Sequence, residues 1–398
     1  MLSSITNAPQ ARRTLLFGSA MHVWSDLYFA LLIPLLIFIQ EDMDLSYTEV
    51  GLLRSVFSGA SAVLQIPAGI LAEGVGEFWL LVLGNVWVAA GLVAMALSPV
   101  FVVLLVTSFV GGLGGGAQHP LASSMVSRAY DARGRSTAVG TVNFAGDLGK
   151  IAAPAIVAGA IAMSLGWRTT IWVVGVAGIA FMVLAAMTRR RVNVAPSTGQ
   201  SPVDTDGSPE ATQRAAFAAL SVVGFLDSAT RGSALVFLPF VMDSKEMSVA
   251  QITAMLVLLF AGGAAGKYIC GWLGERYSAV SLIWGTKGLA ALMLVLSLAA
   301  PPLAMAPLMI VLGIGLNGTS SVLYATVADF VPARRRARLY GLFYTTNEGG
   351  TVLAPICYGL VADLFSLRAT IALMGLATAA ILPVSLSLRK YHSQAPVA

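Results

Sequence analysis

The chain has 398 residues, of which 57% are hydrophobic and 11% are charged, and its mean hydropathy is +0.81. Soluble proteins carry about 25% charged residues, so this composition excludes an ordinary soluble protein and predicts an integral membrane protein. The net charge of +5 comes mainly from Lys and Arg in connecting loops and indicates no nucleic-acid partner. Cys270 and Cys357 lie in separate apolar runs, so we expect neither a disulfide framework nor a metal site.

Apolar runs of roughly 20 residues, the length at which a helix crosses a bilayer, recur along the chain. A transmembrane β-barrel would show short alternating segments instead. We expect the first run to be a retained span, because no small-residue cleavage site precedes it. We therefore predict an all-α membrane fold with twelve spans, near residues 14–39, 48–72, 78–98, 100–127, 136–163, 167–187, 215–242, 249–273, 279–299, 303–328, 338–364 and 367–388.

A polar stretch rich in Pro, Ser, Thr and Gly separates the sixth span from the seventh. Such a composition is typical of a flexible linker. It predicts three parts, which are an N-terminal six-helix bundle over 1–188, a cytoplasmic linker over 189–214 and a C-terminal six-helix bundle over 215–398.

The basic residues of the loops predict the orientation in the membrane. Most of them lie on the side of the two termini, whereas the opposite side holds only Arg168, Lys245 and Arg368. Because cytoplasmic loops carry the excess of Lys and Arg, we expect both termini in the cytoplasm. The predicted location is the inner membrane of a bacterial-type cell.

The two halves of the chain resemble each other. The stretch DLGKIAAPAIVAGAIAMSLGWRTTI, which begins at Asp147, aligns with EGGTVLAPICYGLVADLFSLRATI from Glu348 with one gap. The stretch GILAE at Gly69 aligns with GWLGE at Gly271, again with an offset near 201–202. Two parallel six-span repeats are typical of transporters with a substrate site between the repeats.

The twelve spans, the central linker and the repeat resemble the major facilitator superfamily over essentially the whole chain. In that superfamily the loop after span 2 reads G-x-x-x-D-R/K-x-G-R/K. Here Gly69 and the acid Glu73 remain, and both basic positions are lost. The corresponding loop after span 8 keeps Gly271, Glu275 and Arg276. The resemblance implies that these five residues take part in conformational gating.

Two short patterns are similar to the fosmidomycin-resistance branch of this superfamily. Span 1 contains His22-x3-Asp26-x-Tyr28, and a glycine-rich run in span 4 ends in His119-Pro120. Members of that branch export a phosphonate antibiotic or related compounds. The resemblance implies a secondary transporter. However, span 4 lacks the arginine that the proton-coupled drug exporters of the superfamily usually carry ahead of its glycines, as the stretch VTSFVGGLGGG shows.

Spans 1 and 7 each carry a pair of ionisable residues one helical turn apart, which are His22 with Asp26 and Asp227 with Arg231. A charged residue inside a span costs roughly 2.5–3.5 kcal/mol on insertion scales and usually faces a cavity or a partner. Aligning the single proline of span 1 with that of span 7 places His22 over Asp227 and Asp26 over Arg231. Each pair either faces the central cavity or satisfies itself within its own helix.

Asp147 in span 5 has a counterpart at Glu348 in span 11. Lys150, three residues after Asp147, can hold that acid ionised, whereas Glu348 has no cation within a turn and is the better proton carrier. Lys150 falls opposite the neutral Thr351, which favours a substrate-specific role for the lysine. The alternative is helix packing, because the glycines of GDLG and NEGG allow helices to approach closely.

The remaining ionisable residues of the spans have simpler alternatives. Arg54 and Lys267 lie near span ends, where long side chains reach the interface. Lys287 lies in span 9, which is a peripheral span in the superfamily. His119 precedes Pro120 and either relays protons or bonds to the interrupted backbone.

These observations predict two sets of residues, one for substrate binding and one for proton coupling. The predicted substrate-binding residues are Asp26, Arg54, Asn143, Asp147, Lys150, Arg231, Lys267 and Tyr344. The predicted proton-coupling residues are His22, Asp26, His119, Asp227 and Glu348. Because the first set holds more cations than a neutral ligand requires, the expected substrate is a small amphiphilic organic anion, such as a phosphonate or a carboxylate.

We expect a secondary transporter and no enzyme, with a small-molecule substrate and the lipid bilayer as its partners. The expected energy source is a proton gradient, with no cofactor and no metal, and the expected state is a monomer. Proton-coupled export is the first hypothesis, and uptake or exchange of an organic anion is the alternative. A transporter-like receptor or lipid-handling protein is a third hypothesis, against which the dense intramembrane charge argues.

Overall fold

The computed structural model describes residues 9–130, 132–192, 211–274, 276–327 and 336–392. The chain divides into two compact units, one of Met1–Asp44 with Val56–Gln200 and one of Leu45–Ser55 with Ser201–Ala398. Most of the predicted linker, residues 193–210, lies outside the described residues. The predicted division into 1–188, 189–214 and 215–398 therefore stays a prediction.

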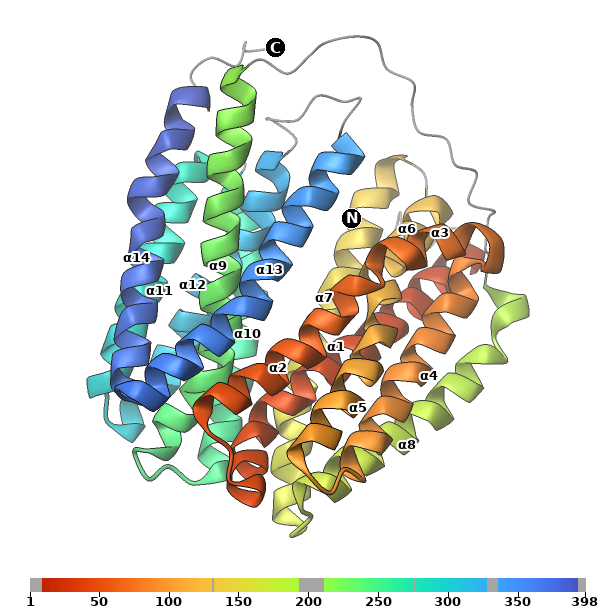
Figure 1. Cartoon of the computed structure of the whole chain (residues 1–398). Coiled ribbons are helices and arrows are strands. Elements are labelled where there is room, and N and C mark those ends of the chain that lie inside the picture. Colours follow the sequence, from red (N-terminus) through yellow and green to blue (C-terminus); the bar gives the residue numbers. More distant parts are fainter. Residues whose placement is uncertain (1–8, 131, 193–210, 275, 328–335, 393–398) are drawn as a thin grey trace. The chain divides into compact units, whose positions relative to one another are not determined.

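The first unit is built from the helices of the N-terminal half (Figure 1). They are α1 (Pro9–Met43), the later part of α2 (Tyr47–Val63), α3 (Gln65–Val75), α4 (Glu77–Ala96), α5 (Phe101–Leu113), α6 (Gln118–Ala129), α7 (Ala132–Ala162) and α8 (Trp167–Ala186). A 3₁₀ turn over Gly114–Ala117 joins α5 to α6.

The second unit is built mainly from the helices of the C-terminal half. They are α9 (Ala211–Asp243), α10 (Val249–Leu273), α11 (Ala279–Ala299), α12 (Pro302–Val327), α13 (Arg336–Leu364) and α14 (Leu367–His392). The first turns of α2 also pack in this unit, where Asp363 of α13 accepts hydrogen bonds from the backbone nitrogens of Tyr47 and Thr48, both at 2.8 Å.

Each of the twelve predicted ranges is helical over its described residues apart from one or two residues at some ends, which confirms the predicted all-helical fold. Two ranges are interrupted, one at Leu64 between α2 and α3 and one at the Gly114–Ala117 turn between α5 and α6. Each break lies just before a proline, Pro67 or Pro120, which then lies in the first turn of a new helix, where its missing N–H is tolerated.

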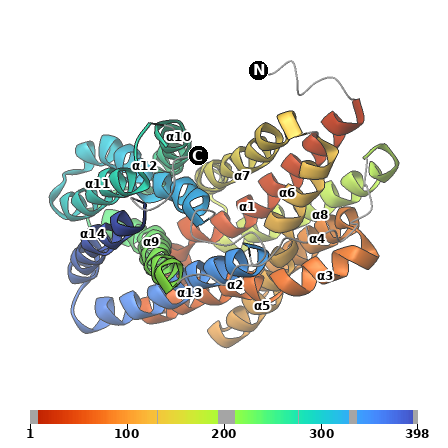
Figure 2. The same ribbon diagram turned by 90° about the horizontal axis from the view of Figure 1, so that it is seen from above.

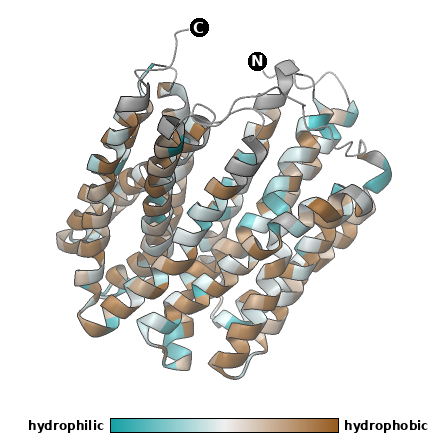
Figure 3. Ribbon diagram, turned by 45° about the horizontal axis from the view of Figure 1, so that its top comes forward, coloured by the Kyte–Doolittle hydropathy of each residue, from teal (hydrophilic) through white to brown (hydrophobic). Residues whose placement is uncertain are grey.

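Hydropathy along the helices agrees with a membrane fold. In the described part of the chain, nine helical segments are long and apolar enough to cross a bilayer. Apolar residues cover most of the length of these helices, as Figure 3 shows in brown. The chain is therefore a multi-pass membrane protein.

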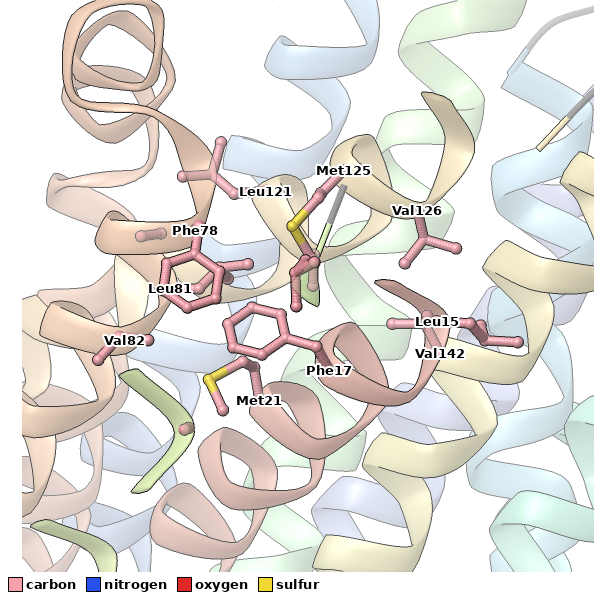
Figure 4. Packing of buried hydrophobic residues seen from close by; sticks show 14 of the residues in the cluster. Leu15, Phe17, Met21, Phe78, Leu81, Val82, Leu121, Met125, Val126 and Val142 are labelled. Carbon is pink, nitrogen blue, oxygen red and sulfur yellow. The ribbon is translucent and has the colours of Figure 1, made fainter. Parts of the chain in front are cut away.

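In the first unit, α1 runs beside α7 and α4 runs beside α8 (Figure 2). An apolar cluster fills the space between α1, α4 and α6, where Phe17 stacks on Phe78 with ring centroids 4.5 Å apart (Figure 4). Met21, Leu81 and Met125 lie in the same cluster and are almost fully buried. Such packing fixes the rotation of α1 about its axis and thereby the direction of its polar residues.

Glycines on α7 and α13 set the register of the two repeats. A Cβ atom at Gly149 would collide with the carbonyl oxygen of Val23 on α1, and one at Gly350 would collide with the carbonyl oxygen of Phe225 on α9. Gly149 and Gly350 are aligned in the sequence repeat. Val23 is therefore equivalent to Phe225, which is 202 positions later.

This packing corrects the register that the prolines of spans 1 and 7 predicted. The prediction placed Asp26 over Arg231, but the helix contacts place it opposite Ser228. His22 is likewise opposite Gly224 and not Asp227. The prolines mislead because they differ by about one turn in position, and a proline kink tolerates such a shift within a long helix.

Asp227 forms a buried ion pair with Lys287 of α11. The two residues are 2% and 1% exposed. Lys287 also donates to the carbonyl oxygens of Gly315 at 2.9 Å and Leu316 at 3.3 Å on α12. Lys287 thus joins three helices of the second unit, a structural role that its place in a predicted peripheral span does not exclude.

The pair makes a direct stability prediction. Replacing Lys287 by Met leaves Asp227 buried without its cation, which should destabilise the protein by about 3–5 kcal/mol. The double variant Asp227→Leu with Lys287→Met removes both charges and should recover most of this loss. The midpoint of thermal unfolding in detergent measures both effects, and Leu292→Ala at an exposed position of α11 is the control. A double variant no more stable than Lys287→Met alone would contradict the pairing.

Candidate functional site

Five ionisable side chains of the first unit meet where α1, α6 and α7 pack together. We call this group the charged cluster, and its members are His22, Asp26, His119, Asp147 and Lys150. The sequence analysis singled out all five residues, but it did not predict that they lie together.

α1 supplies His22 and Asp26 from one face of the helix, because residues four positions apart are neighbours on a helical surface. The distance from His22 Nε2 to Asp26 Oδ2 is 3.6 Å. Both residues are buried, at 2% and 3% exposed. A carboxylate at this depth requires a charged or hydrogen-bonding partner.

α7 supplies that partner. The Nζ atom of Lys150 lies 3.0 Å from Asp26 Oδ2 and 3.1 Å from Asp147 Oδ1. One ammonium group therefore links two carboxylates from two helices. Asp147 is 6% exposed, whereas the Lys150 side chain is 32% exposed.

Gly146 allows this contact between α1 and α7. A Cβ atom at this position would collide with Asp26 Oδ2 and with His22 Cδ2. The glycines of the GDLGK stretch and its charges therefore act at the same place. The helix-packing interpretation and the charge-pairing interpretation of this stretch are compatible.

α6 adds His119, which is the second residue after the 3₁₀ turn that interrupts span 4. Its Nδ1 atom lies 2.9 Å from His22 Nε2, and its Nε2 atom lies 3.5 Å from Asp26 Oδ1. The two imidazole rings meet edge to face. The side chain of His119 is 52% exposed, so the charged cluster is accessible at His119 and at Lys150.

The charged cluster has an odd number of fixed charges. Two carboxylates and one ammonium group give a net charge of −1 when both imidazoles are neutral. A net charge that is largely buried is unfavourable, so the cluster favours one additional positive charge. A proton is one cation that would neutralise the group.

A metal ion is the other cation that this arrangement could attract. His22, Asp26 and His119 each offer a ligand atom, and these atoms lie within 4.8 Å of one another. The ammonium group of Lys150, however, already lies 3.0 Å from Asp26. It competes for the carboxylate that a metal would need.

The second unit repeats only part of the charged cluster. Glu348 takes the place of Asp147, but Thr351 takes the place of Lys150 and Ser228 that of Asp26. Arg231 donates a hydrogen bond to Ser228 Oγ at 3.2 Å. The predicted Asp227–Arg231 pair thus does not satisfy itself, because the partner of Asp227 is Lys287 on another helix.

Glu348 interacts electrostatically with Arg54 of α2, and both residues belong to the second unit. Glu348 therefore has a cation near it on another helix, although no cation lies within one turn of it on its own helix. Among the other predicted substrate-binding residues, Lys267 is half-buried on α10, whereas Asn143 on α7 and Tyr344 on α13 are exposed.

The predicted gating residues that the structure describes lie in or near α3 and the end of α10. Gly69 of α3 and Gly271 of α10 are exposed, and a Cβ atom at either would meet open space. Arg276 stacks over the ring of Trp272, with its guanidinium carbon 4.5 Å from the ring centroid. Glu73 lies in α3, and Glu275 lies outside the described residues.

Sequence reasoning missed an ion pair near these gating positions. Glu77 at the start of α4 is 2% exposed and pairs with Arg128 at the end of α6. Arg128 also donates to Ser124 Oγ at 2.8 Å. An acid at a helix N-terminus is a recognisable signal, but its partner lies 51 positions away, which no local pattern reveals.

The profile of the Major Facilitator Superfamily matches residues 15–219 and again residues 220–397. The chain belongs to this superfamily. The two matches cover nearly the whole chain and agree with the repeat of six spans. The family is one of transporters, which confirms the transporter class that the sequence resemblance implied.

Two relatives of this superfamily member are named for a compound. The chain is 24% identical over 375 residues to the fosmidomycin resistance protein of Escherichia coli, covering 90% of each chain. It is 31% identical over 149 residues to the hexuronate transporter of Bacillus subtilis, covering 37% of this chain and 35% of that protein.

A solved structure shows the same fold. It is the crystal structure of a bacterial homologue of the human lysosomal transporter Spinster in an inward-facing and occupied conformation. The TM-score is 0.83 at 16% identity, with 98% of this chain and 100% of that chain covered. The major facilitator fold of this chain is therefore confirmed.

Gly146 makes a testable prediction for the charged cluster. Gly146→Ala places a methyl group against His22 and Asp26, so we expect a loss of about 1–3 kcal/mol in stability through overpacking. Gly140→Ala on the same helix meets open space and is the matched control. Thermal unfolding of the two purified variants in detergent compares them. Equal midpoints would show that α7 does not approach α1 as described.

Proposed function

We propose that this chain is a secondary active transporter that moves a small amphiphilic organic anion by alternating access, coupled to protons. The observation that carries the proposal is Lys150, which lies between Asp26 and Asp147 beside the His22–His119 pair. A lysine shared by two acids can exchange one of them for an anionic ligand.

The electrostatics of the charged cluster support an anionic substrate. Lys150 is the member with a positive charge, and its side chain is partly exposed. An anion that displaces one carboxylate from the ammonium group forms a charge-assisted hydrogen bond in its place. Two relatives are named for fosmidomycin resistance and for hexuronate transport. A phosphonate or a carboxylate group suits a lysine.

The charge count of the cluster supports proton coupling, because one proton would bring its net charge of −1 to zero. The proton that neutralises it is proposed to reside on the His22–His119 pair, whose facing nitrogens are 2.9 Å apart. Such a shared proton lies next to Asp26 and is accessible through the exposed ring of His119. The transmembrane proton gradient would then drive the cycle.

The direction of transport has two candidates. Export is the first, because the similarity to the fosmidomycin resistance protein extends over 90% of both chains. Uptake is the second, because a proton on the imidazole pair adds a positive charge beside Lys150 and strengthens its attraction for an anion. Export requires the proton and the anion to bind alternately, whereas uptake favours their joint binding.

The proposal also covers the setting of the protein. The distribution of basic residues in the loops supports a bacterial-type inner membrane with both termini in the cytoplasm. We propose a monomer with one small-molecule substrate, no cofactor and no nucleic-acid partner.

Substitution of Lys150 tests the anion site. In proteoliposomes supplied with labelled fosmidomycin or glucuronate, Lys150→Ala should reduce transport roughly tenfold to hundredfold, the equivalent of a lost charge-assisted hydrogen bond. Lys150→Arg keeps the charge and should retain more activity. Lys390→Ala near the end of α14 is the control. Transport by Lys150→Ala at the wild-type rate would refute the role of this lysine.

Imposed pH gradients test proton coupling and decide the direction. Export coupled to proton entry predicts that the substrate moves toward the acidic compartment, whereas joint binding predicts that it moves away from it. His119→Gln should abolish the response to the gradient while leaving substrate binding, and His392→Gln is the control. Flux that ignores the gradient in the wild-type protein would remove the proton from the mechanism.

A further inference from the structure

A pocket of about 580 Å³ lies in the second unit, among the connections α9–α10, α11–α12 and α13–α14. Its lining consists of Lys245, the segment from Leu298 to Pro302 and Arg368. Lys245 and Arg368 are two of the three basic residues in the connections opposite the termini. Two scarce positive charges therefore meet in one pocket.

Lys245 is held in place by backbone acceptors. Its Nζ atom donates to the carbonyl oxygens of Leu298 and Ala300, both at 2.9 Å. An ammonium group has three N–H donors, so one remains for a further acceptor. The two carbonyl bonds fix the position of the charge without neutralising it.

At the corresponding place in the first unit, the basic residue already has a charged partner. Arg168, the counterpart of Arg368 in the sequence repeat, forms an ion pair with Asp42. It also donates to the carbonyl oxygen of Ser98 at 3.4 Å and lies over the ring of Trp167, 4.2 Å from its centroid. The guanidinium group of the first unit thus has an acid and an aromatic face as partners.

The second unit has lost these partners. Ser244 stands 202 positions after Asp42, so a hydroxyl replaces the carboxylate, and Leu367 stands where the first unit has Trp167. Asp243 and Glu246 flank Lys245 along the chain, but neither lines the pocket, whose described lining contains no acid. The pocket therefore has a positive charge and no acid of its own.

Exposed apolar side chains lie beside the pocket in the sequence. Leu303, which follows the pocket residue Pro302, is 94% exposed, and Phe365, three positions before Arg368, is 76% exposed. These residues are at the ends of membrane-spanning helices, where lipid headgroups meet acyl chains. The two cations suit the phosphate of a phospholipid headgroup, and the exposed apolar residues suit its acyl chains.

We propose that Lys245 and Arg368 bind the phosphate of an anionic phospholipid. The extra negative charge of such a lipid complements the second cation of the pocket, which the zwitterionic headgroup of phosphatidylcholine does not. This binding is independent of the charged cluster and of the transport proposal. Its test therefore measures lipid binding and not transport.

Native mass spectrometry of the full-length protein in detergent compares bound phosphatidylglycerol with bound phosphatidylcholine. The wild-type protein should bind phosphatidylglycerol more tightly. Arg368→Gln should weaken this preference about fivefold, the effect of one basic residue near a lipid surface, and Arg368→Lys should retain it. Ser244→Asp restores the acid of the first unit and should weaken the preference while leaving both cations in place.

The controls separate the alternatives. Arg168→Gln removes a basic residue that is already paired with Asp42 and should leave the lipid preference unchanged. Inorganic phosphate in excess should not displace the lipid if the apolar contacts contribute. Equal binding of the two lipids, an equal loss in Arg168→Gln or full displacement by inorganic phosphate would each overturn the proposal.

Discussion

The charged cluster depends on the close packing of α1 against α7. Gly146 and Gly149 present no side chain to α1, so the two helices approach until backbone meets backbone at Val23. Between membrane helices, such small residues permit the close contact that the hydrophobic effect does not drive in lipid. Because the helices are this close, one ammonium group at Lys150 contacts Asp26 and Asp147 together. Helix packing and charge pairing are two consequences of one arrangement.

The two units share this backbone arrangement and differ in its chemistry. Gly350 meets the backbone of Phe225 as Gly149 meets that of Val23. The polar residues that the shared contact positions are nevertheless different, because the second unit has a serine and a threonine where the first has Asp26 and Lys150. In the second unit the buried lysine instead lies on α11, where the first unit has Asn85 at the equivalent place on α4, 202 positions earlier. A repeated scaffold thus carries a partly exposed cluster of charges in one unit and a buried ion pair in the other.

Much of this fold could be predicted from the sequence, and part of the site could not. Hydrophobic runs of bilayer length locate the helices because the lipid imposes that length, and intramembrane charges are rare enough to identify the site residues. Their partners depend on contacts between helices. The proline alignment failed because a kink does not fix a register, and the ion pair of Lys287 could not be predicted because its acid lies 60 positions away, on α9. The contact between His22 and His119 depends on the break in the helix before α6. The glycines and Pro120 predict that the helix is interrupted there, but they do not predict the direction in which α6 continues.

Three lysines differ in how many of their N–H donors are bonded to fixed partners, and this difference separates their roles. Lys287 uses its donors on one carboxylate and two backbone carbonyls and is 1% exposed, so no ligand can reach it without breaking the fold. Lys245 commits two donors to carbonyls and keeps one for the pocket. Lys150 bonds only to side chains, which can rotate or take up protons, and it is partly exposed. Backbone acceptors cannot move away, whereas carboxylates can, and this difference supports the proposed exchange of a carboxylate at Lys150 for an anionic ligand. A binding residue in a transport cycle requires such exchange.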